Sequence, residues 1–259
     1  MTDDIGAVLI TGAAKRIGRA IALALAADGW CVAVHYNQSG DEAEDTLKTI
    51  EAAGGQAVMV AAELGSENDT ASLVERAANG LGQPLTALIN NASAFEHDNI
   101  ETASRQSWDL HMEANLRAPF VLSQAFAAQT TDAPAGTVGN IVNILDQRVW
   151  NLTPEFMSYT LSKAGLWTLT QTLALALAPD IRVNAIGPGP TVASARQTAA
   201  QFAAQNQSVP MRHGSTPDEV AATVRFVLGA RALTGQMIAL DGGQHLAWSG
   251  YGSRGADVE

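Results

Sequence analysis

Short apolar runs alternate with segments of helical periodicity along almost the whole chain, and this alternation restricts the fold more than any other feature of the sequence. Helical crossovers between such runs place the strands parallel in one sheet, with helices on both faces. The sequence therefore predicts an α/β fold, a Rossmann-type doubly wound parallel seven-stranded sheet in a single domain spanning residues 1–259. The predicted strands are residues 6–11, 30–36, 57–61, 85–89, 138–145, 181–186 and 236–240.

The helices between these strands carry their own sequence signals. Residues 41–53 and 67–79 are predicted helices, and a longer one over residues 104–128 holds Asn115 in its middle. Near the C-terminus, Thr216 precedes a proline and is followed three residues later by Glu219, which predicts an N-cap with a capping box.

Composition excludes several classes of protein. A net charge of −11 argues against a nucleic-acid or anionic-membrane surface, and 47% hydrophobic with 16% charged residues is typical of a globular chain. The single cysteine, Cys31, lies in an apolar run, so we expect neither an intramolecular disulfide nor a metal site. No apolar run approaches the ~20 residues of a membrane span, and the acidic N-terminus is unlike a signal peptide. We therefore expect a soluble, cytoplasmic protein.

A glycine turn follows the first strand and opens a helix. Gly12 and Gly18 bracket this turn, and Ile17, Ile21 and Leu25 then recur at helical spacing. Glycines let the backbone approach a pyrophosphate, and a helix N-terminus offers free N–H groups with a positive dipole end. The turn is therefore a candidate dinucleotide site, the alternative being an ordinary turn without a ligand.

The end of the second strand bears on the choice of nucleotide. An NAD site places a carboxylate there for the ribose hydroxyls, whereas an NADP site leaves the strand end neutral or basic for the 2′-phosphate. The first acid after this strand is Asp41, and Lys15 and Arg16 stand in the facing glycine turn. This pattern favours NADP, although His35 and Asn37 can equally be loop residues.

Tyr159 and Lys163 lie four residues apart in a predicted helix and therefore share one helix face. A free tyrosine has a pKa near ~10, so a neighbouring cation is needed for it to transfer a proton near neutral pH. Asp146 stands just after the strand that precedes this helix. In isolation the pair can also be a solvated helix surface.

Two C-terminal segments fall outside the regular alternation. Residues 191–215 follow a strand's carboxyl end and are polar and alanine-rich, which fits a substrate lid or a plain pair of surface helices. Residues 249–259 are small and polar, and we expect a tail that is either disordered or docked on a partner subunit.

Together these motifs resemble the short-chain dehydrogenase/reductase family over nearly the whole chain. They occur in family order and at family spacing, which disfavours the surface interpretation of Tyr159 and Lys163. The matching features are Thr11-Gly12 through Gly18, Asn90-Asn91-Ala92, Asn115, Tyr159 with Lys163, Pro188-Gly189, and Thr234-Gly235-Gln236 to Asp241-Gly242-Gly243.

Three departures from the usual family pattern resemble the pteridine reductases, including the bacterial dihydromonapterin and dihydrofolate reductase branch. Arg16 replaces the middle glycine, Ser93 replaces the last glycine of NNAG, and Asp146 replaces the usual catalytic serine. The resemblance implies an NADPH-dependent reductase of a pteridine-type substrate, with NADPH as cofactor, a small-molecule partner and a homotetrameric assembly. Gln38 stands where those reductases often have a basic residue, which leaves the phosphate selectivity open.

The resemblance also assigns roles to individual residues. The catalytic set is Asp146, Tyr159, Lys163 and Asn115, and the substrate set is Phe95, Asp146, Tyr159 and Arg16. The implied cofactor-binding residues are Gly12, Arg16, Ile17, Gly18, His35, Tyr36, Asn37, Gln38, Ser39, Glu63, Leu64, Asn91, Ala92, Ser93, Tyr159, Lys163, Pro188, Gly189 and Thr191.

In the implied reaction, Lys163 holds the nicotinamide ribose and lowers the pKa of Tyr159, and Asn115 holds a water that resupplies the proton. Phe95 matches a ring that sandwiches a pterin against the nicotinamide, its alternative being a core phenylalanine. Asp146 either stays protonated and donates, or accepts from the amino and N–H groups of the substrate. The competing functions are an NADP-dependent reductase of ketones or aldehydes and a dinucleotide-binding sensor without catalysis.

Overall fold

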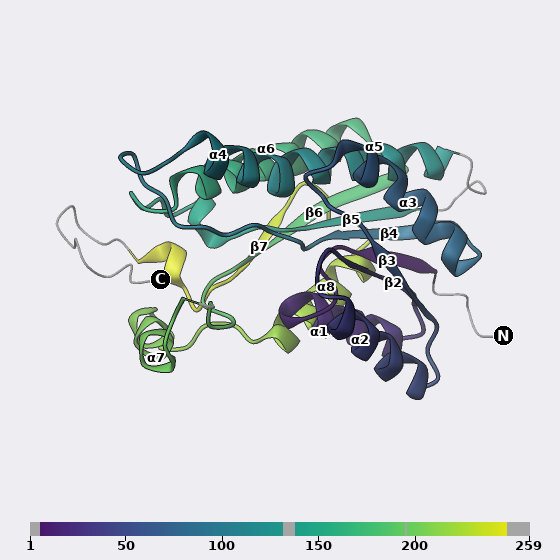
Figure 1. Cartoon of the computed structure of the whole chain (residues 1–259), viewed down its shortest axis with the longest axis horizontal. Helices are drawn as coiled ribbons and strands as arrows, with labels where there is room; N and C mark the ends of the chain where they lie inside the picture. The colour runs from purple at the N-terminus through teal and green to yellow at the C-terminus, as the bar shows by residue number, and fades with distance from the viewer. Residues whose placement is uncertain (1–5, 132–137, 195, 248–259) are drawn as a thin grey trace.

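The strands are apolar on both faces, as parallel strands covered by helices on both sides must be. In the computed structural model, which describes residues 6–131, 138–194 and 196–247, they form one all-parallel sheet in the order β3-β2-β1-β4-β5-β6-β7 (Figure 1). This confirms the predicted doubly wound fold. The strands are β1 Ala7–Ile10, β2 Cys31–Tyr36, β3 Ala57–Ala61, β4 Leu85–Asn90, β5 Gly139–Ile144, β6 Ile181–Pro188 and β7 Met237–Leu240.

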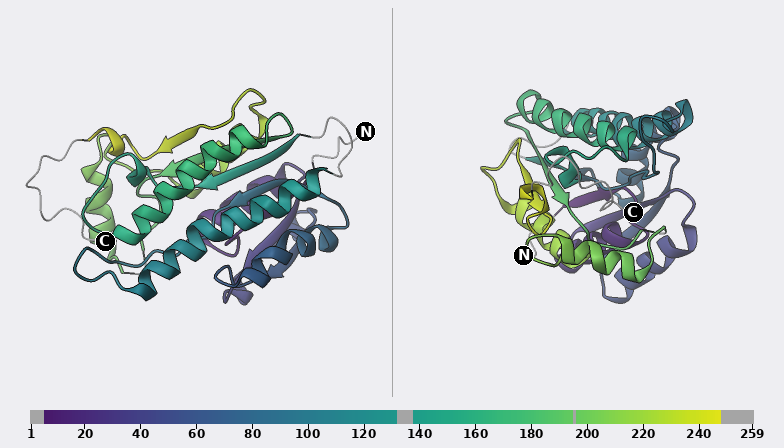
Figure 2. Two further views of the ribbon diagram at one scale, coloured as in Figure 1. Left: turned by 90° about the horizontal axis from the view of Figure 1, so that it is seen from above. Right: turned by 90° about the vertical axis from the view of Figure 1, so that its left-hand side faces the viewer.

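Two layers of helices enclose the sheet and bury separate cores. Helices α3, α5 and α6 cover one face, where Leu73, Leu122 and Phe126 pack against the strands, and α1, α2 and α8 cover the other (Figures 1 and 2). The helices are α1 Arg16–Ala27, α2 Gly40–Ala52, α3 Glu67–Leu81, α4 Arg105–Met112, α5 Ala118–Thr131, α6 Met157–Ala176, α7 Ala199–Ser208 and α8 Pro217–Gly229.

The sheet order reverses between β1 and β4, and this reversal locates the site. Ile10 at the end of β1 is in register with Val34 of β2 and Ile89 of β4, so the carboxyl ends of these strands lie at one edge. Loops that leave in opposite directions from such strands open a crevice where ligands bind.

One predicted helix begins as its local sequence indicates, whereas another is interrupted in the structure. Thr216 accepts from the Glu219 backbone N–H at 3.2 Å and Glu219 accepts from the Thr216 N–H at 2.7 Å, so the predicted capping box of α8 is confirmed. The predicted helix over residues 104–128 is interrupted by a π-helical turn, Glu113–Arg117, between α4 and α5.

None of the helices in the described part of the chain has the length and hydropathy that a bilayer-crossing helix needs. The predicted lid segment contains α7, beyond the carboxyl end of β6. The predicted tail, residues 249–259, lies outside the described residues.

Candidate active site

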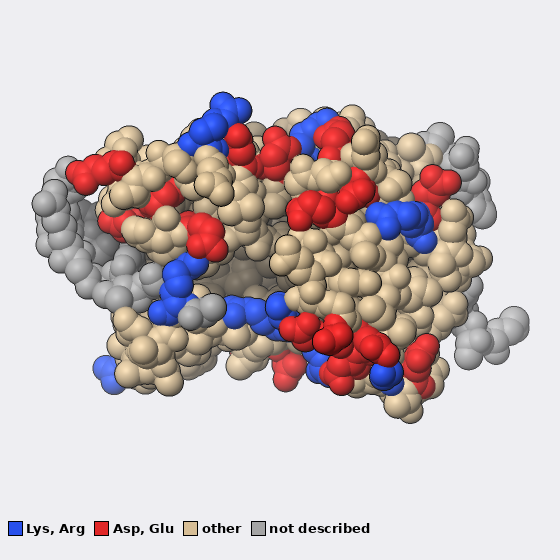
Figure 3. Space-filling view, in the orientation of Figure 1, with Lys and Arg blue, Asp and Glu red and all other residues tan. Residues whose placement is uncertain are grey.

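The surface of the molecule is hollowed on one face, and basic side chains lie along one side of this hollow (Figure 3). Tyr159 and Lys163, on the first turns of α6, meet the end of β5. The Tyr159 hydroxyl donates to Asp146 Oδ2 at 3.0 Å. The other carboxylate oxygen, Oδ1, accepts from the backbone N–H of Arg148 at 2.8 Å and so caps the short 3-10 turn Gln147–Val149. Asp146 therefore acts as an acceptor toward both partners.

The side chain of Lys163 is buried and bonded to the last residue of β5. Its side chain is only 2% exposed, and Nζ donates to the Ile144 carbonyl at 2.8 Å. Burial lowers the pKa of Lys163 to about 8, and the charge of Asp146 opposes this shift in part. The ammonium group has three donors, so two remain for a ligand beyond the Ile144 bond among the described contacts.

Asn115 lies in the π-helical turn and is buried. Its Oδ1 accepts from the Ala94 N–H at 2.7 Å, while Nδ2 donates to the Ala94 carbonyl at 2.9 Å and to Ser162 Oγ at 3.1 Å. The Asn115 amide thus ties the loop after β4 to the helix that carries Tyr159. π-Helical turns concentrate at functional sites, and this one sets the side-chain direction of Asn115.

The glycine turn packs against the Asn91 segment. Gly12 has a φ of +64°, and a Cβ on Gly18 would stand 2.2 Å from the Gly12 carbonyl oxygen. Asn91 Nδ2 donates to the Thr11 and Gly12 carbonyls at 2.8 and 3.2 Å, and Thr11 Oγ1 accepts from the Ala92 N–H at 3.0 Å. The predicted residues Gly12, Gly18, Asn91 and Ala92 therefore form one compact backbone cradle.

This cradle fits the diphosphate of a dinucleotide. Among the described residues, Lys15 at the N-cap of α1 makes no side-chain cap, and the first turn of the helix holds no acid. The first N–H groups of α1 are consequently available to an anion, at the positive end of the helix dipole.

Arg16 has a backbone conformation that favours glycine. Its φ is +56°, in the left-handed region. The guanidinium crosses the opening of the site and donates to the Ala193 and Val192 carbonyls at 2.8 and 3.1 Å. Arg16 thus connects the cradle to the start of the lid segment.

The left-handed conformation of Arg16 leads to a stability prediction. Arg16→Gly and Arg16→Ala both lose the guanidinium, but only alanine keeps the left-handed cost of a side chain. We expect the free energy of unfolding of the glycine variant to be about 1 kcal/mol higher than that of the alanine variant. Urea titrations of the two variants measure this difference, and an alanine variant of equal or greater stability would contradict the strain.

The side chain of His35 is buried under the glycine turn. It is 2% exposed, its Nδ1 accepts from the Gly12 N–H at 2.9 Å, and Nε2 donates to the Ala62 carbonyl at 3.2 Å. Burial lowers the pKa of His35 to about 4, so the ring is neutral near pH 7. Its side chain supports the glycine turn from β2 and supplies no cation for a 2′-phosphate.

The other predicted residues at this end of the sheet lie around the β2–α2 loop. Asn37 and Gln38 are exposed, and Asn37 Nδ2 donates to Glu63, whose other oxygen accepts from the Gly65 N–H at 3.0 Å. Leu64 is buried, Tyr36 and Ser39 are partly exposed, and Ile17 packs into the α1 core. The loop is neutral, with Lys15 and Arg19 paired to Glu42 and Asp45 beside it.

Phe95, in the loop after β4, packs against Tyr159. The two ring centroids are 4.6 Å apart with the rings edge to face. Phe156 stacks on Phe95 at 4.6 Å with an interplanar angle of 8°, and the Arg196 guanidinium lies over the Phe95 ring at 5.3 Å. Arg196 also pairs with Glu96 at 2.8 Å and donates to the Phe95 carbonyl at 2.7 Å. These bonds join the lid segment to the loop after β4.

The remaining predicted residues follow β6. Pro188 ends that strand, the Gly189 N–H donates to the Leu240 carbonyl at 2.9 Å, and a Cβ on Gly189 would stand 2.7 Å from Asp241 Cα. Thr191 Oγ1 donates to the Gly189 carbonyl at 3.0 Å. Ser93, in the loop after β4, donates to Asn115 Oδ1 at 3.2 Å.

Several site residues escaped the sequence interpretation, namely Asp98, His111, Phe156, Ser158 and Arg196. They come from four separate segments and share no spacing pattern. Only the position of Ser158, next to Tyr159, could have drawn attention to one of them.

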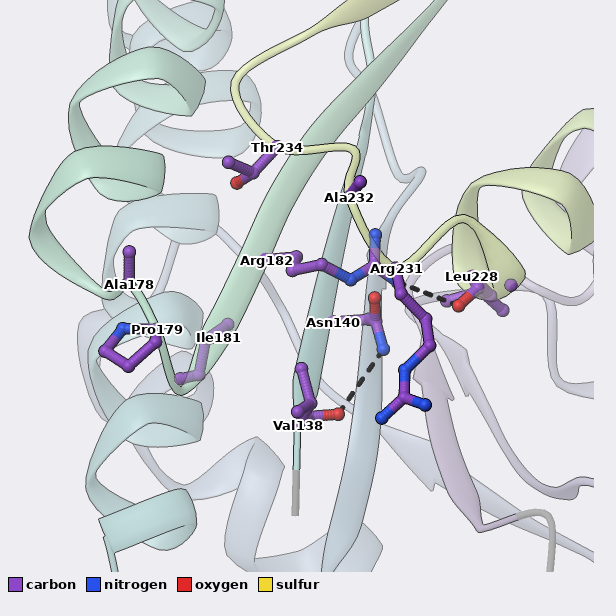
Figure 4. Close-up of a pocket in the computed structure, with 11 residues that line it drawn as sticks. Val138, Asn140, Ala178, Pro179, Ile181, Arg182, Leu228, Arg231, Ala232 and Thr234 are labelled. Carbon is purple, nitrogen blue, oxygen red and sulfur yellow. Dashed lines mark hydrogen bonds between the residues drawn. The ribbon is translucent and has the colours of Figure 1, made fainter. Parts of the chain in front are cut away.

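A cavity of about 730 Å³ lies at the other end of the sheet and is separate from this site (Figure 4). Arg182 projects into it and donates to the Val227 and Leu228 carbonyls at 3.1 and 2.8 Å. These carbonyls end α8, so Arg182 acts as a C-terminal cap of that helix.

Residues 12–245 match the family profile described as enoyl-(acyl carrier protein) reductase. An uncharacterised oxidoreductase of Methylorubrum extorquens is 33% identical over 91% of this chain and 96% of its own length. The 3-oxoacyl-(acyl carrier protein) reductase FabG of Staphylococcus epidermidis is 29% identical over 92% of this chain and 98% of its own length.

Two solved structures are more similar in sequence than these relatives. The FolM alternative dihydrofolate reductase 1 of Brucella suis, in complex with NADP, is 46% identical with a TM-score of 0.89, covering 94% of this chain and 96% of that one. The Brucella canis FolM structure, also with NADP, is 45% identical with a TM-score of 0.90, covering 96% and 97%.

Proposed function

The chain belongs to the short-chain dehydrogenase/reductase family of oxidoreductases, and from this premise we propose that it is an NADPH-dependent reductase of a dihydropteridine. The substrate class is a dihydropterin, a dihydromonapterin or a dihydrofolate. The similarity to the FolM structures supports this proposal, since it exceeds the similarity to the acyl-carrier-protein reductases by more than ten percentage points of identity.

The acceptor role of Asp146 is the observation that carries the proposal. A ketone oxygen gains from a hydrogen-bond donor, which a serine at this position supplies. A carboxylate that accepts from the Tyr159 hydroxyl and the Arg148 N–H instead suits the N–H and amino groups of a nitrogen-rich ring. Asp146 at the substrate therefore favours a pteridine over a simple carbonyl compound.

The cofactor is NADPH, held by the cradle of Gly12, Gly18, Asn91 and Ala92 and by the N-terminus of α1, where Arg16 and Ile17 stand. When bound, NADPH supplies the hydride that reduces the C=N carbon of the substrate. Asn91 to Ser93 line the nicotinamide side, and Glu63 and Leu64 lie at the adenine side. Pro188 and Gly189 lead to Thr191, which reaches the cofactor phosphates. The loop Tyr36 to Ser39 surrounds the 2′-phosphate with the backbone of His35.

Tyr159 is the proton donor of the proposed reaction. Its hydroxyl delivers a proton to the substrate ring nitrogen, and the Lys163 ammonium, which holds the nicotinamide ribose, favours the phenolate that remains. We place the water that returns the proton at the backbone of Asn115 in the π-helical turn, because the side-chain amide already bonds Ser93, Ala94 and Ser162. Phe95 offers an aromatic surface for the flat substrate, and Arg196, which now lies over that ring, has to move aside when the substrate stacks there.

Lys163 gives a pH prediction. A lysine is charged below its pKa, so its cation is present at neutral pH and is lost as the pH rises through about 8. We expect kcat/KM for NADPH, which reports on the free enzyme, to fall above pH 8 by up to about tenfold per pH unit. Lys163→Met should give a low, flat profile over the same range. If kcat/KM of this variant still falls above pH 8, a group other than Lys163 causes the pH dependence.

We also propose a homotetramer, built in part through the tyrosine-bearing helix. Leu161 and Leu175 expose 46% and 85% of their surfaces on α6, whereas Leu166 is buried in the core. Light scattering on the purified protein measures the assembly, and a monomer would contradict it.

A substrate panel tests the proposed function. The rate of NADPH oxidation is measured with dihydromonapterin, dihydrobiopterin and dihydrofolate, and with a series of ketones and aldehydes. Turnover of at least one dihydropteridine with a higher kcat/KM than any carbonyl compound is the expected result. Turnover of carbonyl compounds only would instead identify a ketone or aldehyde reductase.

A further inference from the structure

Three polar side chains form a buried hydrogen-bonded cluster next to Tyr159, outside the residues used so far. Asp98, His111 and Ser158 are 1%, 0% and 0% exposed. His111 Nδ1 lies 2.7 Å from Ser158 Oγ, and Ser158 Oγ donates to Asp98. The His111 ring stands edge to face with Tyr159, with centroids 5.9 Å apart.

One backbone contact fixes the protons in this cluster. The Glu96 N–H donates to His111 Nε2 at 2.9 Å, so Nε2 carries no proton. In a neutral imidazole the proton is then on Nδ1, which donates to Ser158 Oγ, and the Ser158 hydroxyl donates onward to Asp98. Burial lowers the pKa of His111, which agrees with the neutral form.

Asp98 anchors the far end of the chain of hydrogen bonds. Its Oδ1 accepts from the Ser158 N–H at 3.1 Å, its Oδ2 accepts from Ser107 Oγ at 3.1 Å, and its carbonyl accepts from the Met157 N–H at 3.3 Å. Phe156, at the N-cap of α6, makes no side-chain cap among the described contacts. Asp98 therefore caps the helix that carries Tyr159 from a loop 60 residues earlier.

The two nitrogens of His111 reach the two functional sides of the site. Nε2 holds the backbone of Glu96, the residue after Phe95, and Nδ1 holds Ser158, the residue before Tyr159. Phe95 and Tyr159 are themselves in edge contact. The imidazole ring of His111 on α4 thus connects the segment of Phe95, the aromatic surface, with the segment of Tyr159, the proton donor.

We propose that His111 is a positioning residue that fixes the aromatic surface of Phe95 through Nε2 and the proton donor Tyr159 through Nδ1. The proposal rests on the proposed function, in which Phe95 contacts the substrate and Tyr159 transfers the proton. Substrate binding and the chemical step consequently depend on different nitrogens of one side chain.

Two substitutions separate these nitrogens. Asparagine places its amide nitrogen near the Nδ1 position and keeps the donor to Ser158, whereas glutamine places its amide oxygen near Nε2 and keeps the acceptor for Glu96. For His111→Asn we expect KM for the substrate to rise about tenfold with kcat changed little, as for one lost hydrogen bond. For His111→Gln we expect kcat to fall about tenfold with KM changed little.

The control is Asp109→Asn, on the exposed side of the same helix, where the carboxylate pairs only with Arg105 among the described residues. Both kinetic constants should stay at the wild-type values in this variant. If His111→Asn and His111→Gln change KM and kcat in parallel, or change neither, the positioning role is overturned.

A measurement on the wild-type protein covers the case in which a variant does not fold. The ¹⁵N chemical shifts of the His111 ring at neutral pH should report a protonated Nδ1 and a bare Nε2, and the opposite tautomer or an imidazolium would overturn the proposal. This readout needs no substrate. If the enzyme reduced only ketones, the proposed function would fail while the tautomer stood, and the KM and kcat comparison would then be made with the ketone.

Discussion

Replacement of Tyr159 by phenylalanine is expected to lower kcat by about 10²- to 10⁴-fold, the usual contribution of a positioned proton donor. The ring, its contact with Phe95 and the buried Lys163 amine all remain in this variant. NADPH binding should therefore change by less than about threefold, because the loss is confined to the transition state. Steady-state kinetics and fluorescence titration with NADPH measure the two quantities.

Thr160 offers a matched control on the same helix. Its buried hydroxyl has no hydrogen-bond partner among the described residues, so Thr160→Val removes an adjacent hydroxyl without breaking a bond. We expect this variant to keep the wild-type kcat. A Tyr159→Phe enzyme of full activity would exclude Tyr159 as the proton donor, and a wild type that binds NADPH but reduces nothing would favour the sensor.

Asp146→Ser is the second substitution with a large expected effect. The serine hydroxyl can still cap the Arg148 N–H, so the 3-10 turn should be preserved. It removes the charged acceptor for the substrate N–H groups, and we expect kcat/KM for the dihydropteridine to fall about 100-fold. Activity with a ketone should stay constant or rise, because a hydroxyl can donate to a carbonyl oxygen.

Asp146→Asn separates charge from shape at the same position. The amide keeps one oxygen acceptor and the size of the carboxylate, so we expect a loss smaller than that of the serine variant. Ratios of kcat/KM for a dihydropteridine and a ketone, measured in all three proteins, give the comparison. A serine variant that keeps the wild-type ratio would show that Asp146 does not select the substrate class.

The sheet and its covering helices could be predicted because each element has a local signal. The strand over residues 57–61 was predicted with the bounds it has in the structure, and the capping box at Thr216 follows from neighbouring residues alone. The interruption of the long helix at Asn115 could not be predicted, since a π-helical turn shifts the hydrogen-bond register without a distinctive residue pattern.

The environment of the His35 side chain also could not be predicted from the sequence. Parallel strands are buried on both faces and show no alternation of polar and apolar residues, so the direction of one polar side chain cannot be inferred. The structure places His35 under the glycine turn, where a neutral imidazole meets the Gly12 N–H. The phosphate loop therefore lacks the cation that a histidine there could have supplied.

The contacts between segments distant in the chain are the part of the site that could not be predicted from the sequence. Tyr159, Lys163 and Asp146 were predicted from their spacing and from family resemblance. Asp98 and His111 approach Ser158 only because the loop after β4, helix α4 and helix α6 fold together. No local periodicity encodes that approach.

Transfer of an isotopic label tests the central claim most directly. NADPH carrying deuterium at the reactive C4 position is incubated with the enzyme and a dihydropteridine, and the product is analysed by mass spectrometry and NMR. Hydride transfer to the C=N carbon predicts one deuterium on that ring carbon and none elsewhere in the product. A pteridine recovered without deuterium, while ketones in parallel reactions become labelled, would contradict the account.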